Sequence, residues 1–303
     1  MEKLKGVKAL AFSSIMASIT ILFILLTSYM VGVGIIAIIT IPLISSFVSL
    51  KVDWKYRLVY FCACLITLII DPSLTIFIVI PSLVSGIVLG QLIGKYIQGY
   101  YIIFITTLVV TALQILSTYL IDFVFEVNMI ELFSIFLSID IIDFSTLYFL
   151  FLFILSLIQV CLSYTIITNE LKKLNIEFNE RKNQFYPVFY YNIGLLILSV
   201  ISFFVSKTLY YLSLGFTIYF GVILAYYIFS FFEKKKILII QIPLYFLCIL
   251  GFMILYSIVG NENAIILLLL PFLSQILTAS YIIFYQKHVK KGTINESLFD
   301  KLN

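Results

Sequence analysis

The chain has very little charge for its length. Only 11% of its 303 residues are Asp, Glu, Lys or Arg, whereas 63% are hydrophobic. Soluble domains carry about 25% charged and about 45–50% apolar residues, so a water-facing shell could not cover this much apolar surface. The composition therefore excludes a soluble globular protein and a disordered chain. The net charge of +4 is small and comes from lysines in predicted loops, which excludes a nucleic-acid binder.

The residues and motifs of common active sites are also scarce. His288 is the one histidine, and all four cysteines (Cys62, Cys64, Cys161 and Cys248) lie within apolar runs, where a free cysteine packs as a small hydrophobe. The sequence contains no HExxH, no GxSxG and no phosphate-binding glycine loop before a lysine. We therefore expect no catalytic residue, no metal site and no cofactor, and predict that the protein is not an enzyme.

What the sequence does have is long apolar runs. A membrane-spanning helix needs about 20 mostly apolar residues, and breaking the chain at its charges and turn residues gives about ten such runs. The sequence thus predicts an all-α, polytopic transmembrane helix bundle. The predicted spans are 9–28, 31–50, 58–71, 74–94, 101–123, 145–168, 187–206, 208–232, 237–259 and 264–286.

The basic residues predict the orientation of these spans. With the N-terminus inside, the cytoplasmic segments hold every Lys and Arg except Lys207, as the positive-inside rule requires. Both termini are therefore predicted to be cytoplasmic, in a multi-pass protein of the bacterial inner (plasma) membrane.

The longest polar loop divides the chain. We expect a six-span membrane domain over 1–168, a cytoplasmic linker over 169–186, a four-span domain over 187–286 and a cytoplasmic tail over 287–303.

One polar stripe stands out on the fifth predicted span. It consists of Thr107, Thr111, Gln114, Thr118 and Asp122, whose spacings of three and four place them on one helical face. Lipid cannot satisfy these groups, so the polar stripe must face other helices or a wet cavity. It could line the path of a solute that enters beside Asp122, or it could join helices by hydrogen bonds. A cavity beside the stripe would favour the path, and a sealed stripe would count against it.

Segment 126–143 follows this span and is apolar but interrupted by acids. Its pattern predicts a helix lying along the outer membrane surface. Such a helix could cover the outer end of the polar stripe as a lid, or it could be a plain amphipathic connector.

Small residues recur every four positions on two other spans, which lets helix backbones approach closely. Packing within the bundle is the default interpretation, and contact with a partner protein is the alternative. These candidate helix-contact residues are Ala9, Ser13 and Ala17 in the first span and Ser82, Gly86, Gly90 and Gly94 in the fourth.

The layout also resembles a known family. A basic N-terminus precedes the small-residue helix from Lys8 to Ala17, a tight hairpin leads to the basic loop 51–57, and the helix PSLVSGIVLG ends near Gly94-Lys95. This resembles the YybS-like family of uncharacterised bacterial membrane proteins, which is similar to the S components of energy-coupling-factor (ECF) transporters. The resemblance covers about residues 5–168. The last four spans fit it less well, because an S component usually has six helices.

The resemblance implies a function. In S components, small residues on the first helix contact the coupling transmembrane subunit, so Ala9, Ser13 and Ala17 would form the coupling face, with Ser13 in place of the usual alanine. It also implies a solute pocket near the outer face and partner ATPases, but it indicates no substrate. We therefore expect a transport-related protein that binds a small solute at the extracytoplasmic side.

The alternative is a non-transporting scaffold or regulatory subunit that contacts partners through helix faces and the 169–186 loop. A third possibility is a membrane-embedded transferase acting on lipid-linked substrates, for which clustered acids or a basic groove would be needed.

Overall fold

The computed structural model describes residues 3–29, 34–137, 141–174, 185–231, 243–244, 247, 250–251 and 269–289, and every regular element within them is a helix. The chain divides into two compact units, Met1–Glu180 (unit 1) and Arg181–Asn303 (unit 2). Helix α8 of unit 1 continues to Lys173, so the first residues of the expected 169–186 loop are helical. Residues 175–184 of that loop, and most of the predicted span 237–259, lie outside the described residues.

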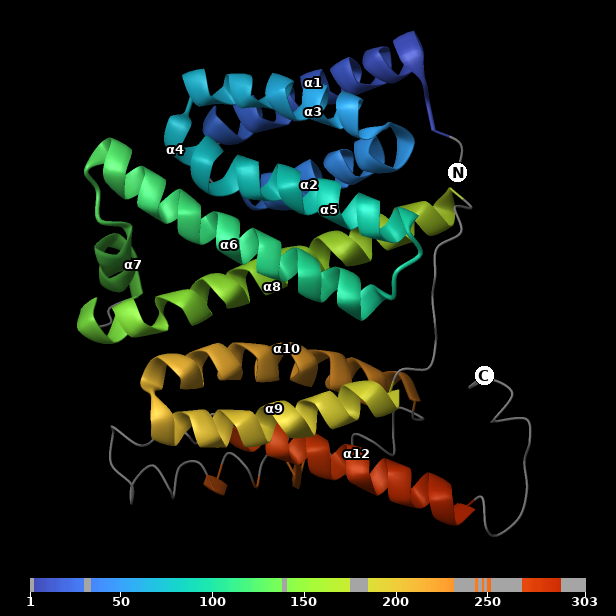
Figure 1. Ribbon diagram of the computed structural model, residues 1–303, viewed down its shortest axis with the longest axis vertical. Coiled ribbons are helices and arrows are strands. Elements are labelled where there is room, and N and C mark those ends of the chain that lie inside the picture. The colour runs from blue at the N-terminus through green and yellow to red at the C-terminus, as the bar shows by residue number, and fades with distance from the viewer. Residues whose placement is uncertain are drawn as a thin grey trace. The chain divides into compact units, whose positions relative to one another are not determined.

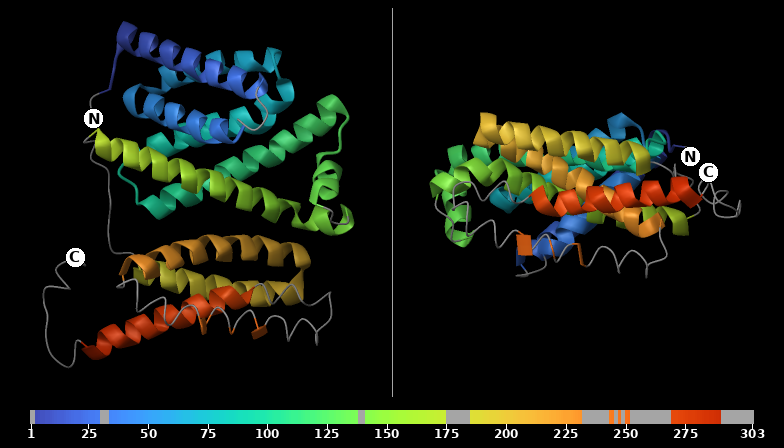
Figure 2. Two further views of the ribbon diagram at one scale, coloured as in Figure 1. Left: turned by 180° about the vertical axis from the view of Figure 1, so that it is seen from behind. Right: turned by 90° about the horizontal axis from the view of Figure 1, so that it is seen from below.

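The described residues of unit 1 form eight α-helices, a 3₁₀ turn (η1, Leu65–Ile69) and a π-helical segment (η2, Thr75–Val79). Figure 1 shows the long helices stacked in layers, with α7 lying crosswise where α6 ends and α8 begins, and Figure 2 shows the same arrangement from behind. The α-helices are α1 (Gly6–Tyr29), α2 (Gly34–Lys51), α3 (Trp54–Cys64), α4 (Pro72–Leu74), α5 (Ile80–Gly94), α6 (Gly99–Phe125), α7 (Met129–Leu137) and α8 (Ile141–Lys173).

Unit 2 contains the hairpin of α9 (Phe185–Val205) and α10 (Lys207–Phe231), together with α12 (Leu270–Val289). Across the described residues, five helical stretches are long and apolar enough to cross a membrane, so the protein is a multi-pass helical membrane protein. These five candidate spans are Gly6–Tyr29, Pro72–Gly94, Gly99–Phe125, Leu147–Lys173 and Phe185–Val205. Two shorter apolar helices, Ala37–Lys51 and Leu209–Ala225, fall within other predicted spans.

The predicted span 58–71 is not one α-helix. Helix α3 ends at Cys64 and continues as the 3₁₀ turn to Ile69. Asp71 then starts the next helix, because its Oδ1 atom accepts a hydrogen bond from the Leu74 N–H at 3.0 Å. The following π-helical segment comes just before Pro81, which lacks a backbone donor and so disturbs the regular ladder.

Close backbone contact joins α2 and α5. A Cβ atom added to Gly86 would lie 2.5 Å from the Ser45 Cβ, and one added to Gly90 would lie 2.5 Å from the Ser46 carbonyl oxygen. The Ser49 hydroxyl also donates to the Ile87 carbonyl at 2.8 Å. The glycine face of the fourth predicted span is therefore occupied inside unit 1. At the end of the same helix, a Cβ on Gly94 would meet only the side chain of Leu50, at 3.4 Å.

The small face of α1 also lies in the core of unit 1. Ala9 and Ser13 have no exposed surface and Ala17 is 2% exposed. On the same buried side, the Thr20 hydroxyl lies 2.9 Å from the Tyr60 hydroxyl of α3. The Ser45 hydroxyl of α2 lies 3.1 Å from that same Tyr60 oxygen. These contacts join α1, α2 and α3 through the face that the sequence marks for close approach.

Candidate functional site

Helix α6 turns its polar stripe toward the rest of unit 1. Thr107, Thr111, Gln114 and Thr118 are at most 7% exposed, and Asp122 is half-buried. The side chains of Leu116 and Phe123, in contrast, are exposed. The helical period therefore separates a polar, buried face from an apolar, exposed face.

The part of the polar stripe from Thr107 to Gln114 makes one described hydrogen bond to another helix. The Gln114 Oε1 atom accepts it from the Ser156 hydroxyl of α8 at 2.8 Å. The Thr111 hydroxyl instead donates to the Thr107 carbonyl of its own helix at 2.8 Å. The buried Thr107 hydroxyl has no hydrogen-bond partner among the described residues. Gln114 therefore joins α6 to α8, and the two threonines are buried in unit 1 without a described bond to another helix.

A second buried amide ties α8 to α5. The Gln159 Nε2 atom donates to the Ser82 hydroxyl at 2.9 Å, and both side chains are buried. Ser82, from the set of small residues, therefore serves as a hydrogen-bond acceptor as well as a small contact. The sequence places Ser156 and Gln159 on one face of the eighth helix, but the register between α6 and α8 is needed to name their partners.

The end of the polar stripe that holds Thr118 and Asp122 has different neighbours. The Thr118 hydroxyl lies 2.7 Å from the Tyr148 hydroxyl of α8. Asp122 holds the start of α7, because its Oδ1 atom accepts a hydrogen bond from the Met129 N–H at 2.9 Å. A carboxylate at the first turn of a helix also interacts favourably with the helix dipole. Asp122 thus fixes α7 to the end of α6.

Helix α7 covers this end of the polar stripe with the ring of Phe133. The Phe133 ring lies 5.9 Å from Phe77 of η2, 6.2 Å from Tyr148 and 5.4 Å from Phe151, measured between ring centroids. On the other side of α7, Ile135 is 67% exposed. The helix is shorter than the expected 126–143 segment, since residues 126–128 precede it, 138–140 lie outside the described residues and α8 begins at Ile141.

A basic hollow of about 330 Å³ lies at the other end of unit 1. Its walls are Lys5, Gly6, Asp53, Trp54, Lys55 and Tyr56.

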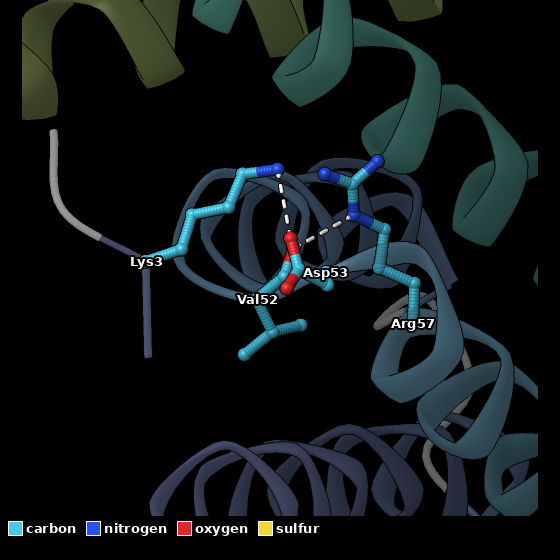
Figure 3. Close-up of polar contacts among 4 residues, drawn as sticks. All are labelled: Lys3, Val52, Asp53 and Arg57. Carbon is cyan, nitrogen blue, oxygen red and sulfur yellow. Dashed lines mark hydrogen bonds and ion pairs between the residues drawn. The ribbon is translucent and has the colours of Figure 1, made fainter. Parts of the chain in front are cut away.

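Two contacts shape the charge around this basic hollow. The Lys3 ammonium lies 3.1 Å from the Asp53 carboxylate, and the Arg57 Nε–H donates to the Val52 carbonyl at 3.1 Å; both contacts are drawn in Figure 3. Partial burial lowers the pKa of Arg57, while the Asp53 carboxylate acts in the opposite direction. The guanidinium still carries its charge at any physiological pH. In the sequence these residues indicate only the orientation of the spans and the basic loop 51–57, whereas the fold brings Lys5 and Lys55 into one hollow.

Comparison with known proteins gives one match. Residues 18–149, from α1 into α8, match a family model described as "Predicted membrane protein (DUF2232)". No curated protein and no solved structure matches the chain. The matched region includes the whole polar stripe and α7. Over less than half of its length, therefore, the chain is similar to a family of predicted membrane proteins, in agreement with its apolar helices.

Proposed function

We propose that the protein is a transport-related membrane component whose unit 1 binds a small solute, in the manner of an S component. The observation that carries this proposal is the position of α7, which is fixed to Asp122 and lies over the outer end of the polar stripe. A lid attached beside polar and aromatic side chains suits a site that opens and closes.

The solute site is assigned to the outer end of the stripe alone. Thr118, Asp122 and Tyr148 supply hydroxyl and carboxylate groups there, and Phe133 covers them from α7. The inner residues of the polar stripe are given a packing role, because Gln114 already bonds Ser156 across the helix interface. In this closed arrangement the site becomes accessible only when α7 moves away.

The proposed topology follows the charges. In it the chain has about ten spans, both termini and the basic hollow are cytoplasmic, and α7 is extracytoplasmic. Energy would come from an ECF-type transmembrane subunit with its ATPases. Because Ala9, Ser13 and Ala17 are buried in unit 1, such a subunit would have to contact the exposed side of α1, which presents Ile15 and Leu22.

The alternative proposal is a non-transporting scaffold or regulatory subunit that binds other membrane proteins. The observation in its favour is the closure of the stripe: Ser156 bonds Gln114, and the glycine face of α5 is filled by α2. A bundle that ties its polar groups together in this way is stable without any solute.

Cysteine accessibility separates the two proposals. Thr118→Cys is introduced after the four native cysteines are changed to Ala, and intact cells are treated with a membrane-impermeant maleimide. A solute site that opens to the outside predicts labelling at position 118 on the time scale of minutes, because α7 opens. Glu126→Cys, in the exposed segment after α6, is the positive control, and Leu116→Cys on the exposed apolar face is the negative control. Labelling of the Glu126 control without any labelling at position 118 would favour the scaffold.

A further inference from the structure

The basic hollow is formed where two helices begin. Gly6 is the first residue of α1, Trp54 is the first residue of α3, and both line the hollow. The chain before α1 is held against the end of α2, because the Leu4 N–H donates to the Lys51 carbonyl at 2.8 Å. Two segments about fifty positions apart are thereby brought together into one wall.

Positive charge dominates this hollow. Lys5 and Lys55 line it, and neither has an ion-pair partner among the described residues. Asp53 is the one acid in the lining, and Lys3 neutralises it at 3.1 Å. The first backbone N–H groups of α1 and α3 add partial positive charge at the same place. An anion that enters the hollow would meet two free ammonium groups.

The hollow also lies at the end of a candidate membrane span. Helix α1 is a candidate span and begins at the wall of the hollow. Trp54 is 62% exposed beside it, and tryptophan side chains at span ends lie at the level of the lipid headgroups. Long lysine side chains at such positions extend their charge toward the phosphate layer.

We propose that the hollow lined by Lys5, Trp54 and Lys55 binds a phosphate group, carried by the headgroup of an anionic lipid or by a free phosphate. Its volume of about 330 Å³ is within the range of small-molecule sites, about 300–1,000 Å³. Lysine ammonium groups bind phosphate as point charges. This binding is independent of the solute site under α7.

The single tryptophan of the chain reports on this site directly, because Trp54 lines the hollow and no other tryptophan contributes to the fluorescence. The full-length protein in a neutral detergent is titrated with short-chain phosphatidylglycerol, short-chain phosphatidylcholine and inorganic phosphate. We expect a saturable change in Trp54 emission with phosphatidylglycerol and none with phosphatidylcholine. Saturation by inorganic phosphate at the same concentration would instead assign the site to a free anion.

Paired variants test the two lysines. Lys5→Gln with Lys55→Gln is expected to weaken phosphatidylglycerol binding by about tenfold or more, since each cation near a phosphate layer contributes to binding. Lys5→Arg with Lys55→Arg should retain it. The control, Lys95→Gln with Lys172→Gln, also removes two positive charges but at positions outside the hollow. It should leave binding unchanged. The proposal is overturned if neither phosphatidylglycerol nor phosphate changes the emission, or if the Gln pair binds as tightly as the natural protein.

Discussion

Two buried amides of unit 1 differ from Asn192 of unit 2 in their hydrogen bonds. In unit 1, Gln114 accepts from Ser156 and Gln159 donates to Ser82, so both amides join helices that are distant in sequence. In unit 2, Asn192 has no exposed surface, and neither its Oδ1 nor its Nδ2 atom has a partner among the described residues. Because a membrane offers no water to such groups, a buried amide stabilises a bundle only when a partner is in place. Gln114 and Gln159 are therefore expected to stabilise unit 1, and Asn192 is expected to weaken unit 2.

Two glycines, one from each unit, also differ in their surroundings. Gly86 of α5 meets the α2 backbone, whereas a Cβ on Gly194 of α9 would have nothing within 4 Å. The difference belongs to these two positions and not to the units, because a Cβ on Gly221 of α10 would lie 2.5 Å from the Phe272 side chain.

The largest expected change in stability follows from adding one methyl group at Gly86, and the same change at Gly194 is its matched control. Gly86→Ala forces α2 and α5 apart and should cost about 3 kcal/mol or more of stability, the upper range for overpacking. Gly194→Ala adds the same methyl group in open space and should stabilise its helix by about 0.5–1 kcal/mol. Thermal unfolding in detergent, followed by circular dichroism, measures both. Equal effects of the two changes would contradict the packing of α5 on α2.

Removing the hydrogen bond between the Gln159 amide and Ser82 in unit 1 should cause the next largest loss of stability. Gln159→Leu leaves the buried Ser82 hydroxyl without its donor and should cost about 1–3 kcal/mol. Adding Ser82→Ala to it removes both partners and should recover most of that loss. The same unfolding measurement gives the coupling between the two positions. If the second change makes the first one worse, the hydrogen bond between α8 and α5 is not the cause.

In unit 2, replacing a buried amide by leucine is expected to raise stability instead of lowering it. Asn192→Leu removes an amide that has no described partner and should raise stability by about 1 kcal/mol, since an unsatisfied buried polar group is costly. Its readout is the melting temperature of the purified protein, with Asn192→Ala as the smaller control. A fall in melting temperature with Asn192→Leu would show that this amide has a partner in the intact protein.

Releasing α7 should have a smaller effect on overall stability than Gly86→Ala or Gln159→Leu. Asp122→Ala removes the acceptor of the Met129 N–H and should cost about 0.5–2 kcal/mol, the range for losing a helix N-terminal acceptor. Asp122→Asn keeps an acceptor oxygen and should cost less. Limited proteolysis of the chain after Phe125 measures the release, and unchanged cleavage in Asp122→Ala would show that other contacts hold α7.

Features that repeat along a single helix could be predicted from the sequence. The spacing of Thr107, Thr111, Gln114 and Thr118 places them on one face, and the structure has that face buried. The apolar runs likewise give the positions of α1, α6 and α9, because each helix must cross about 30 Å of hydrocarbon.

Features that depend on how helices meet could not be read from the sequence. The break after Cys64 follows a continuous apolar run, and nothing in that run distinguishes a 3₁₀ turn from an α-helix. The pairing of Thr118 with Tyr148 depends on the register of α6 against α8. The basic hollow brings together Lys5 and Lys55, which are 50 positions apart in the sequence.

The central claim, that α7 is a lid fixed by Asp122, is tested most directly by measuring a distance across it. Spin labels are placed at Ile135→Cys on α7 and Tyr119→Cys on α6, both exposed positions, in a protein without native cysteines and in lipid nanodiscs. Double electron–electron resonance should give two distances, for closed and open α7, and Asp122→Ala should shift the population to the longer one. A single narrow distance that Asp122→Ala leaves unchanged would contradict the lid.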